Sequence, residues 1–141
     1  MSVIRREPRR VRRARRRVAF YADRARRAGS PKGRMKVAAD ELLSAAAHAR
    51  NPARAATDAA EEVTEQARWV LAQADLTPGA RALYEDQLAR QPAPRPRLGA
   101  ALTCLRAGIG HLPVTAEERD RLYEHYTAEL TREAGRLRGE R

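Results

Sequence analysis

The stretch that decides the fold is RRVRRARRRVAFYADRARRAG, which runs from Arg9 to Gly29. Seven of the nine residues from Arg9 to Arg17 are arginine. Apolar residues nevertheless recur at alternating spacings of three and four, the repeat of one face of an α-helix. The pattern predicts an amphipathic helix from about Pro8 to Ala28 that stops at Gly29 in a left-handed cap. The apolar stripe consists of Val11, Ala14, Val18, Tyr21, Ala25 and Ala28.

The basic charge is concentrated at the N-terminal end of the chain. The 141 residues carry a net charge of +11, but residues 1–36 alone hold fifteen Arg or Lys against Glu7 and Asp23, a net of +13. The rest of the chain has a net charge of −2. A GC-rich genome, such as we expect of a bacterial source, would explain the use of 27 Arg against 2 Lys, but it would not explain their clustering. This asymmetry is typical of contact with nucleic acid or an anionic surface.

Five further helices are predicted, and strand patterns are nearly absent. A capping residue followed by proline opens three of them, and Thr115 with Glu118 forms a capping box before the last. We therefore expect an all-α fold, a small bundle of about five to six helices with an Arg-rich N-terminal helix. The further helices are expected at about Pro31–Ala49, Pro52–Ala74, Pro78–Arg90, from Leu98 to Gly108 or Gly110, and from Thr115 onward.

Composition divides the chain into four parts. Residues 1–29 form a basic N-terminal helix or arm, 30–90 a helical core, and 98–141 a C-terminal helical pair. Between the last two, QPAPRPR at 91–97 contains three prolines, which predict an extended linker that excludes helix. The core is lean, because most apolar stripes are built from alanine and bury little area. Packing within a monomer and pairing in a homodimer both fit such stripes.

The basic residues suit phosphate contact. Arginine presents a planar fork that matches phosphate oxygens, and a helix of about 20 residues spans ~30 Å, close to one turn of duplex DNA. We therefore predict a non-enzymatic protein that binds nucleic acid electrostatically, double-stranded DNA rather than RNA. The candidate contact residues are Arg5, Arg6, Arg9, Arg10, Arg12, Arg13, Arg15, Arg16, Arg17, Arg24, Arg26, Arg27, Lys32, Arg34 and Lys36.

Several alternatives stay open. The basic arm of a helical adaptor could dock on an acidic protein partner, or the arginines could form a solvated face without a ligand. A membrane-surface helix is disfavoured because the stripe is poor in Leu, Phe and Trp. Phe20 and Tyr21 could stack on bases, but we expect both to pack on the body of the protein. A helix-turn-helix is disfavoured by the acidic run from Asp58 to Glu65.

Other chemistry is not expected. Cys104 is the sole cysteine, in an apolar run, so we predict a buried core residue and a reduced, cytoplasmic setting. His111, His125 and Glu129 are too few for a zinc site. We expect no metal, no cofactor and no catalytic residue. No apolar run approaches the ~20 residues of a membrane span, so no integral membrane insertion is expected.

Overall fold

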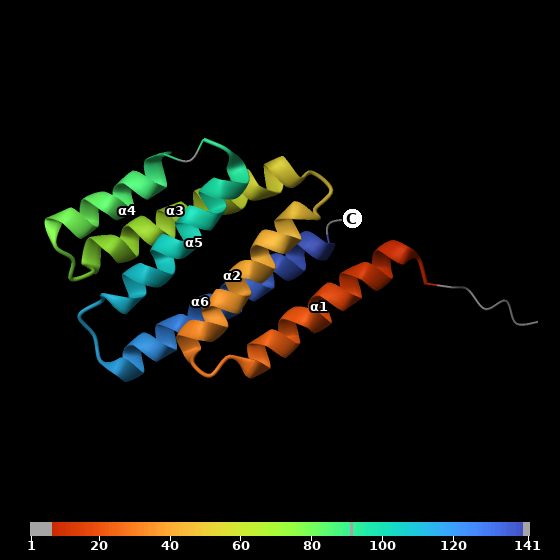
Figure 1. Cartoon of the computed structure of the whole chain (residues 1–141), viewed down its shortest axis with the longest axis horizontal. Helices are drawn as coiled ribbons and strands as arrows, with labels where there is room; N and C mark the ends of the chain where they lie inside the picture. Colours follow the sequence, from red (N-terminus) through yellow and green to blue (C-terminus); the bar gives the residue numbers. More distant parts are fainter. Residues whose placement is uncertain (1–6, 91, 140–141) are drawn as a thin grey trace, which may run out of the picture.

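Six α-helices make up nearly all of the structure (Figure 1). The computed structural model describes residues 7–90 and 92–139, and within these ranges it contains no β-strand. The all-α fold class and the predicted number of about five to six helices are therefore confirmed. In chain order the helices are α1 (Arg9–Arg27), α2 (Pro31–Ala47), α3 (Pro52–Gln73), α4 (Pro78–Arg90), α5 (Pro94–Gly110) and α6 (Ala116–Gly139).

Four of the helices begin with the capping bond that the sequence predicts. In each, a side-chain oxygen of the preceding residue accepts a hydrogen bond from a backbone N–H in the first turn, which has no partner within the helix. The first residues of α2, α3 and α4 are prolines, whose missing N–H is not needed there. The bonds run from Gly33 N to Ser30 Oγ at 3.0 Å, from Arg54 N to Asn51 Oδ1 at 3.2 Å, from Ala80 N to Thr77 Oγ1 at 3.1 Å and from Glu118 N to Thr115 Oγ1 at 3.1 Å.

The prediction of an extended linker at 91–97 is wrong over most of its length, because α5 begins at Pro94. Ala93 is the N-cap, so Pro94 and Pro96 occupy the first and third positions of the helix. The first three residues of a helix donate no intrahelical hydrogen bond. Both prolines therefore fit in the first turn without the loss of a bond. Gln91, the first residue of the predicted linker, lies outside the described residues.

The predicted left-handed cap at Gly29 is also wrong, since none of the described glycines has a positive φ. Helix α1 ends at Arg27, and Ala28 is already extended, with φ −67° and ψ 122°. Ser30 is extended too, because the proline that follows it disfavours the helical region. The chain passes from α1 to α2 through these extended residues and needs no left-handed one.

Helices α2, α3, α5 and α6 build the core. Helix α3 packs along α5 and α6 packs along α2, while α2 also contacts α3 and α5. Figure 1 shows α2 and α6 side by side, with α4 on the far side of the α3–α5 pair. The parts 30–90 and 98–141 therefore share one core rather than forming separate units. The largest fully buried side chains are Met35, Leu42, Val70, Leu71, Leu98, Cys104, Leu105 and Ile109.

Small residues bring α3 and α5 close together. Ala67 of α3 and Ala101 of α5 are fully buried. A Cβ atom added at Gly108 of α5 would lie only 3.0 Å from Val70 Cγ1 of α3. A Cβ atom added at Gly99, earlier in the same helix, would meet no heavy atom within 4 Å. The two helices are thus in tight contact at Gly108, and this residue has no room for a side chain.

Two arginines hold the connections that precede α4 and α6. Arg81 Nη1 donates to the Leu71 carbonyl at 2.5 Å, and its Nη2 donates to the Ala74 carbonyl at 3.0 Å. Both carbonyls lie at the C-terminal end of α3, and the Leu71 carbonyl also accepts a hydrogen bond from Ala74 N at 3.3 Å. Arg119 Nη2 likewise donates to the Leu112 carbonyl at 3.2 Å. In both places an arginine closes a turn of the backbone.

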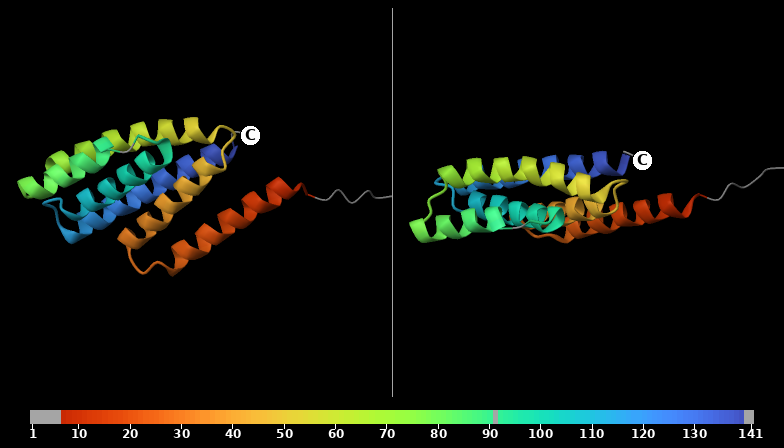
Figure 2. Two further views of the ribbon diagram at one scale, coloured as in Figure 1. Left: turned by 45° about the horizontal axis from the view of Figure 1, so that its top comes forward. Right: turned by 90° about the horizontal axis from the view of Figure 1, so that it is seen from above.

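Helix α1 lies at the edge of the bundle and packs mainly against α2 (Figure 2). Ala14 is its only buried residue, and Val11 and Val18 of the predicted stripe each stay 40% exposed. Arg24 Nη2 donates to Asp40 Oδ2 of α2 at 3.0 Å, which ties the two helices together. One side of α1 thus contacts the body, and the other side faces solvent along its whole length.

Candidate nucleic-acid interface

The outer side of α1 carries a cluster of four arginines, which we call the arginine face: Arg9, Arg12, Arg13 and Arg16. At 100° per residue these four positions fall within an arc of about 100°. Ala14 and Tyr21, which pack toward α2, lie on the other side of the helix. The four side chains are exposed, and together they line a hollow of about 280 Å³. The geometry directs several guanidinium groups toward one region of solvent.

The arginine face is electrostatically unbalanced. Among the described residues, no acidic side chain lies within 4.0 Å of any of its four guanidinium groups. The acidic residues of α1 and its N-terminus are engaged elsewhere, because Glu7 pairs with Arg15 and Asp23 pairs with Arg26 and Arg27. Each pair of arginines four residues apart lowers the stability of a helix by a few tenths of a kcal/mol. A polyanion over this face would remove that repulsion.

The structure divides the remaining predicted contact residues into two groups. Three form ion pairs that join helices or lie within α2: Arg24 and Lys36 with Asp40, at 3.0 and 2.6 Å, and Arg34 with Glu124 of α6, at 3.5 Å. Of the others, five lie on α1 and one on α2: Arg10, Arg15, Arg17, Arg26 and Arg27 on α1 and Lys32 on α2. Arg10 and Lys32 are exposed and Arg17 is half-buried, whereas Arg5 and Arg6 lie outside the described residues.

The two neighbouring aromatic residues of α1 have different environments. Tyr21 is half-buried toward α2, as expected, but Phe20 is 56% exposed. The expectation that both pack on the body is therefore wrong for Phe20. Consecutive helical positions differ by 100°, so both cannot face α2. The ring centroids are 5.1 Å apart in an edge-to-face arrangement, and the guanidinium carbon of Arg24 lies 5.8 Å from each centroid.

A groove of about 610 Å³ lies beside α1, between this helix, the end of α2 and the start of α5. Tyr21 and Arg24 form its α1 wall, and His48 and Arg95 contribute from the other two helices. The sequence prediction missed Arg95, because residues 91–97 were interpreted as a linker rather than as the first turn of a helix. In the sequence, only the positive charge of Arg95 could have indicated a contact residue. The fold brings Arg95 near α1.

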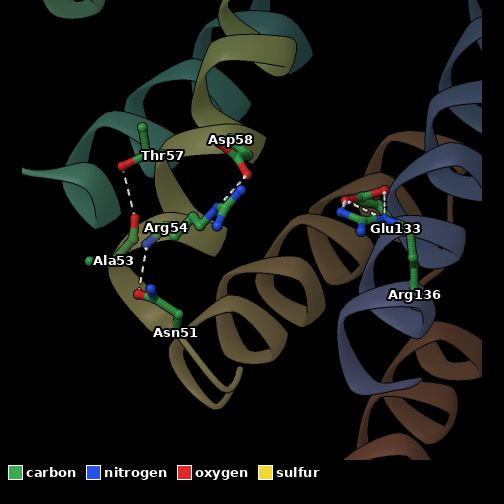
Figure 3. A network of polar contacts seen from close by, with 7 residues as sticks. All are labelled: Asn51, Ala53, Arg54, Thr57, Asp58, Glu133 and Arg136. Atoms are coloured by element: carbon green, nitrogen blue, oxygen red, sulfur yellow. Dashed lines mark hydrogen bonds and ion pairs between the residues drawn. The ribbon is translucent and has the colours of Figure 1, made fainter. Parts of the chain in front are cut away.

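Three further arginines line a pocket at the turn between α2 and α3; Figure 3 shows two of them, Arg54 and Arg136, each beside a carboxylate. The third is Arg50, and the pocket has a volume of about 410 Å³. Arg54 Nε lies 3.9 Å from Asp58 Oδ2, and Arg136 Nε donates to the Glu133 carboxylate at 3.0 Å. These carboxylates offset part of the positive charge. The pocket is therefore a weaker site for a polyanion than the arginine face.

The other reactive groups lie in unremarkable surroundings. Burial, with a smaller contribution from Glu85, raises the pKa of the Cys104 thiol to about 11. The Cys104 side chain is fully buried, as predicted for a core residue. Within the described ranges, no three His, Cys, Asp or Glu side chains are placed to share a metal ion. No helix among these residues is long and apolar enough to cross a membrane.

Comparisons with protein-family models, with curated proteins and with solved structures find no match to this chain. Its function must therefore be argued from its own side chains. The feature that most needs an explanation is the arginine face, where exposed like charges lie together without counter-charges among the described residues.

Proposed function

We propose that this protein binds double-stranded DNA through the arginine face of α1, mainly by contacts with phosphate groups. The observation that carries the proposal is a hollow whose lining, among the described residues, consists of Arg9, Arg12, Arg13 and Arg16. A guanidinium group binds phosphate oxygens through two parallel hydrogen bonds. A hollow lined by several such groups therefore suits the phosphate groups of a nucleic-acid backbone.

The position of α1 supports the same proposal. The helix lies at the edge of the bundle, so a long polyanion can approach it without a clash with the body (Figure 2). The ion pair between Arg24 and Asp40 joins α1 to α2, so the arginines are presented on a helix that contacts the body of the protein. Because no base-reading pattern accompanies them, the expected binding depends on charge more than on sequence.

The decisive measurement is the salt dependence of binding to a labelled DNA duplex, followed by fluorescence anisotropy. Each phosphate contact contributes about 0.9 to the slope of log affinity against log salt. Replacement of the four arginines of the arginine face by glutamine should therefore reduce the slope by about 3 to 4. Circular dichroism checks that the variant remains helical.

A matched control removes the same charge elsewhere. Arg68, Arg90, Arg121 and Arg132 are exposed and lie outside α1 and outside the arginine-lined pocket at the turn between α2 and α3, and their replacement by glutamine changes the net charge equally. The control should keep most of the wild-type slope. Equal losses in the two variants would mean that net charge, and not the arginine face, determines binding, and salt-insensitive binding would contradict the proposal outright. Duplex RNA as competitor then measures the preference for DNA.

A further inference from the structure

We propose that Phe20 contacts an unstacked base of the bound duplex, so that the arginine face prefers mismatched or otherwise distorted DNA. This inference rests on the proposed function and adds a base contact to it. It starts from the exposure of Phe20, a large apolar side chain that is 56% exposed in the most basic part of the chain.

Phe20 lies in line with the arginine face. Its position on the helix falls within the arc of about 100° that holds the four arginines, and it follows Arg16 by four residues, about one helical turn. A nucleic-acid backbone bound by Arg13 and Arg16 would therefore pass next to the ring. Arg27 also lies within this arc, seven residues or about two helical turns after Phe20, and its guanidinium group pairs with Asp23.

The ring of Phe20 is held in place by its neighbours. Tyr21 contacts it edge to face at 5.1 Å between centroids, and the Arg24 guanidinium lies over it at 5.8 Å. Arg24 is in turn anchored to Asp40 of α2 at 3.0 Å. A side chain that is already ordered loses little conformational entropy on binding, so contact with a ligand is favoured.

The surroundings of Phe20 suit a base better than an apolar protein surface. A protein that covered the ring would also cover Arg13 and Arg16 and remove these charges from water, which is costly without counter-charges. A nucleotide provides both partners, a phosphate for the guanidinium group and an aromatic face for the ring. Apolar wedges on basic helices insert where base steps unstack at low cost, and mismatches are such steps.

The test compares a perfect duplex with a duplex that carries one mismatch beside 2-aminopurine, whose fluorescence reports unstacking. We expect the wild-type chain to bind the mismatched duplex roughly tenfold more tightly than the perfect one, and to change the fluorescence of the probe. Phe20→Ala should bind the two duplexes equally, while its salt slope stays that of the wild type. Phe20→Trp should retain the preference, since it keeps an aromatic face.

The matched control is Val18→Ala, which shortens an exposed apolar side chain on a different side of the same helix. It should behave as the wild type does with both duplexes. If Phe20→Ala keeps the wild-type preference, or if the wild type has none, the inference is overturned while the proposed function stands. If the wild type shows no salt-dependent binding to either duplex, the proposed function fails and the inference with it.

Discussion

Alanine substitutions at two glycines of α5 should have opposite effects on stability. Alanine is favoured over glycine in a helix interior by about 0.5–1 kcal/mol. At Gly99 the added methyl group meets nothing within 4 Å, so Gly99→Ala should stabilise the protein by that amount. At Gly108 the same methyl group would lie 3.0 Å from Val70 Cγ1 and 3.3 Å from Leu71 Cδ2.

Those two neighbours cannot swing away, because both side chains are 1% exposed. Forced repacking of this kind costs about 1–3 kcal/mol. The helix-propensity gain is similar in the two variants, so Gly108→Ala should be less stable than Gly99→Ala by about the repacking cost. Urea unfolding followed by far-ultraviolet circular dichroism measures this difference directly. Thermal unfolding should show it as a gap of about 4 °C per kcal/mol.

A result that would refute the reasoning is a Gly108→Ala variant as stable as Gly99→Ala. The interface between α3 and α5 would then have room for a methyl group at Gly108, which the structure does not show. The comparison is informative because both changes add the same single carbon to the same helix. Only the proximity of α3 differs between the two positions.

Three further predictions concern single residues. Burial raises the pKa of Glu41 above 4.5, although the guanidinium group of Arg138, 3.7 Å away, opposes part of this effect. The folded state therefore binds the proton of the Glu41 carboxyl group more tightly than the unfolded state does. The stability of the wild type relative to Glu41→Gln should therefore fall as the pH rises through and above 4.5, and urea unfolding of both proteins at about pH 4 and pH 7 checks the sign. The thiol of Cys104, with a pKa of about 11, should react with a thiol-specific reagent only after unfolding, and rapid modification of the folded protein would contradict its burial. Ser30→Ala removes the cap of α2 and should cost about 1 kcal/mol, which a shift in urea midpoint with an unchanged slope would show.

The local features of the fold were predictable because they depend on neighbouring residues. Ser30, Asn51, Thr77 and Thr115 each lie directly before a helix and bond to its first turn, so the sequence is enough to place four helix starts. The misplaced start of α5 has a local cause as well. Prolines exclude the interior of a helix but not its first turn, and the number of prolines alone does not distinguish the two.

The site was predictable only in part, because ion pairing depends on tertiary structure. The charge of α1 is evident from the sequence, and the four-residue spacing of Lys36 and Asp40 suggests their pairing within α2, but nothing in the sequence reveals that Arg24 of α1 also binds Asp40. The same limit applies to Phe20 and Tyr21, which are adjacent in sequence. The packing of α1 against α2 decides which of the two rings is exposed, and that contact joins residues on different helices.

The hydrogen bonds of Arg81 show that geometry, and not only codon usage, requires arginine at some positions of this chain. Its two terminal nitrogens donate to two different carbonyls, those of Leu71 and Ala74. A lysine carries its donors on one nitrogen and cannot reproduce this fork. If codon usage were the only reason for arginine, lysine could replace it at any basic position. Arg81→Lys, however, would preserve the charge and still lose hydrogen bonds at the end of α3. The preference for guanidinium over ammonium is therefore expected to be strict at such turns, whatever the genome favours elsewhere.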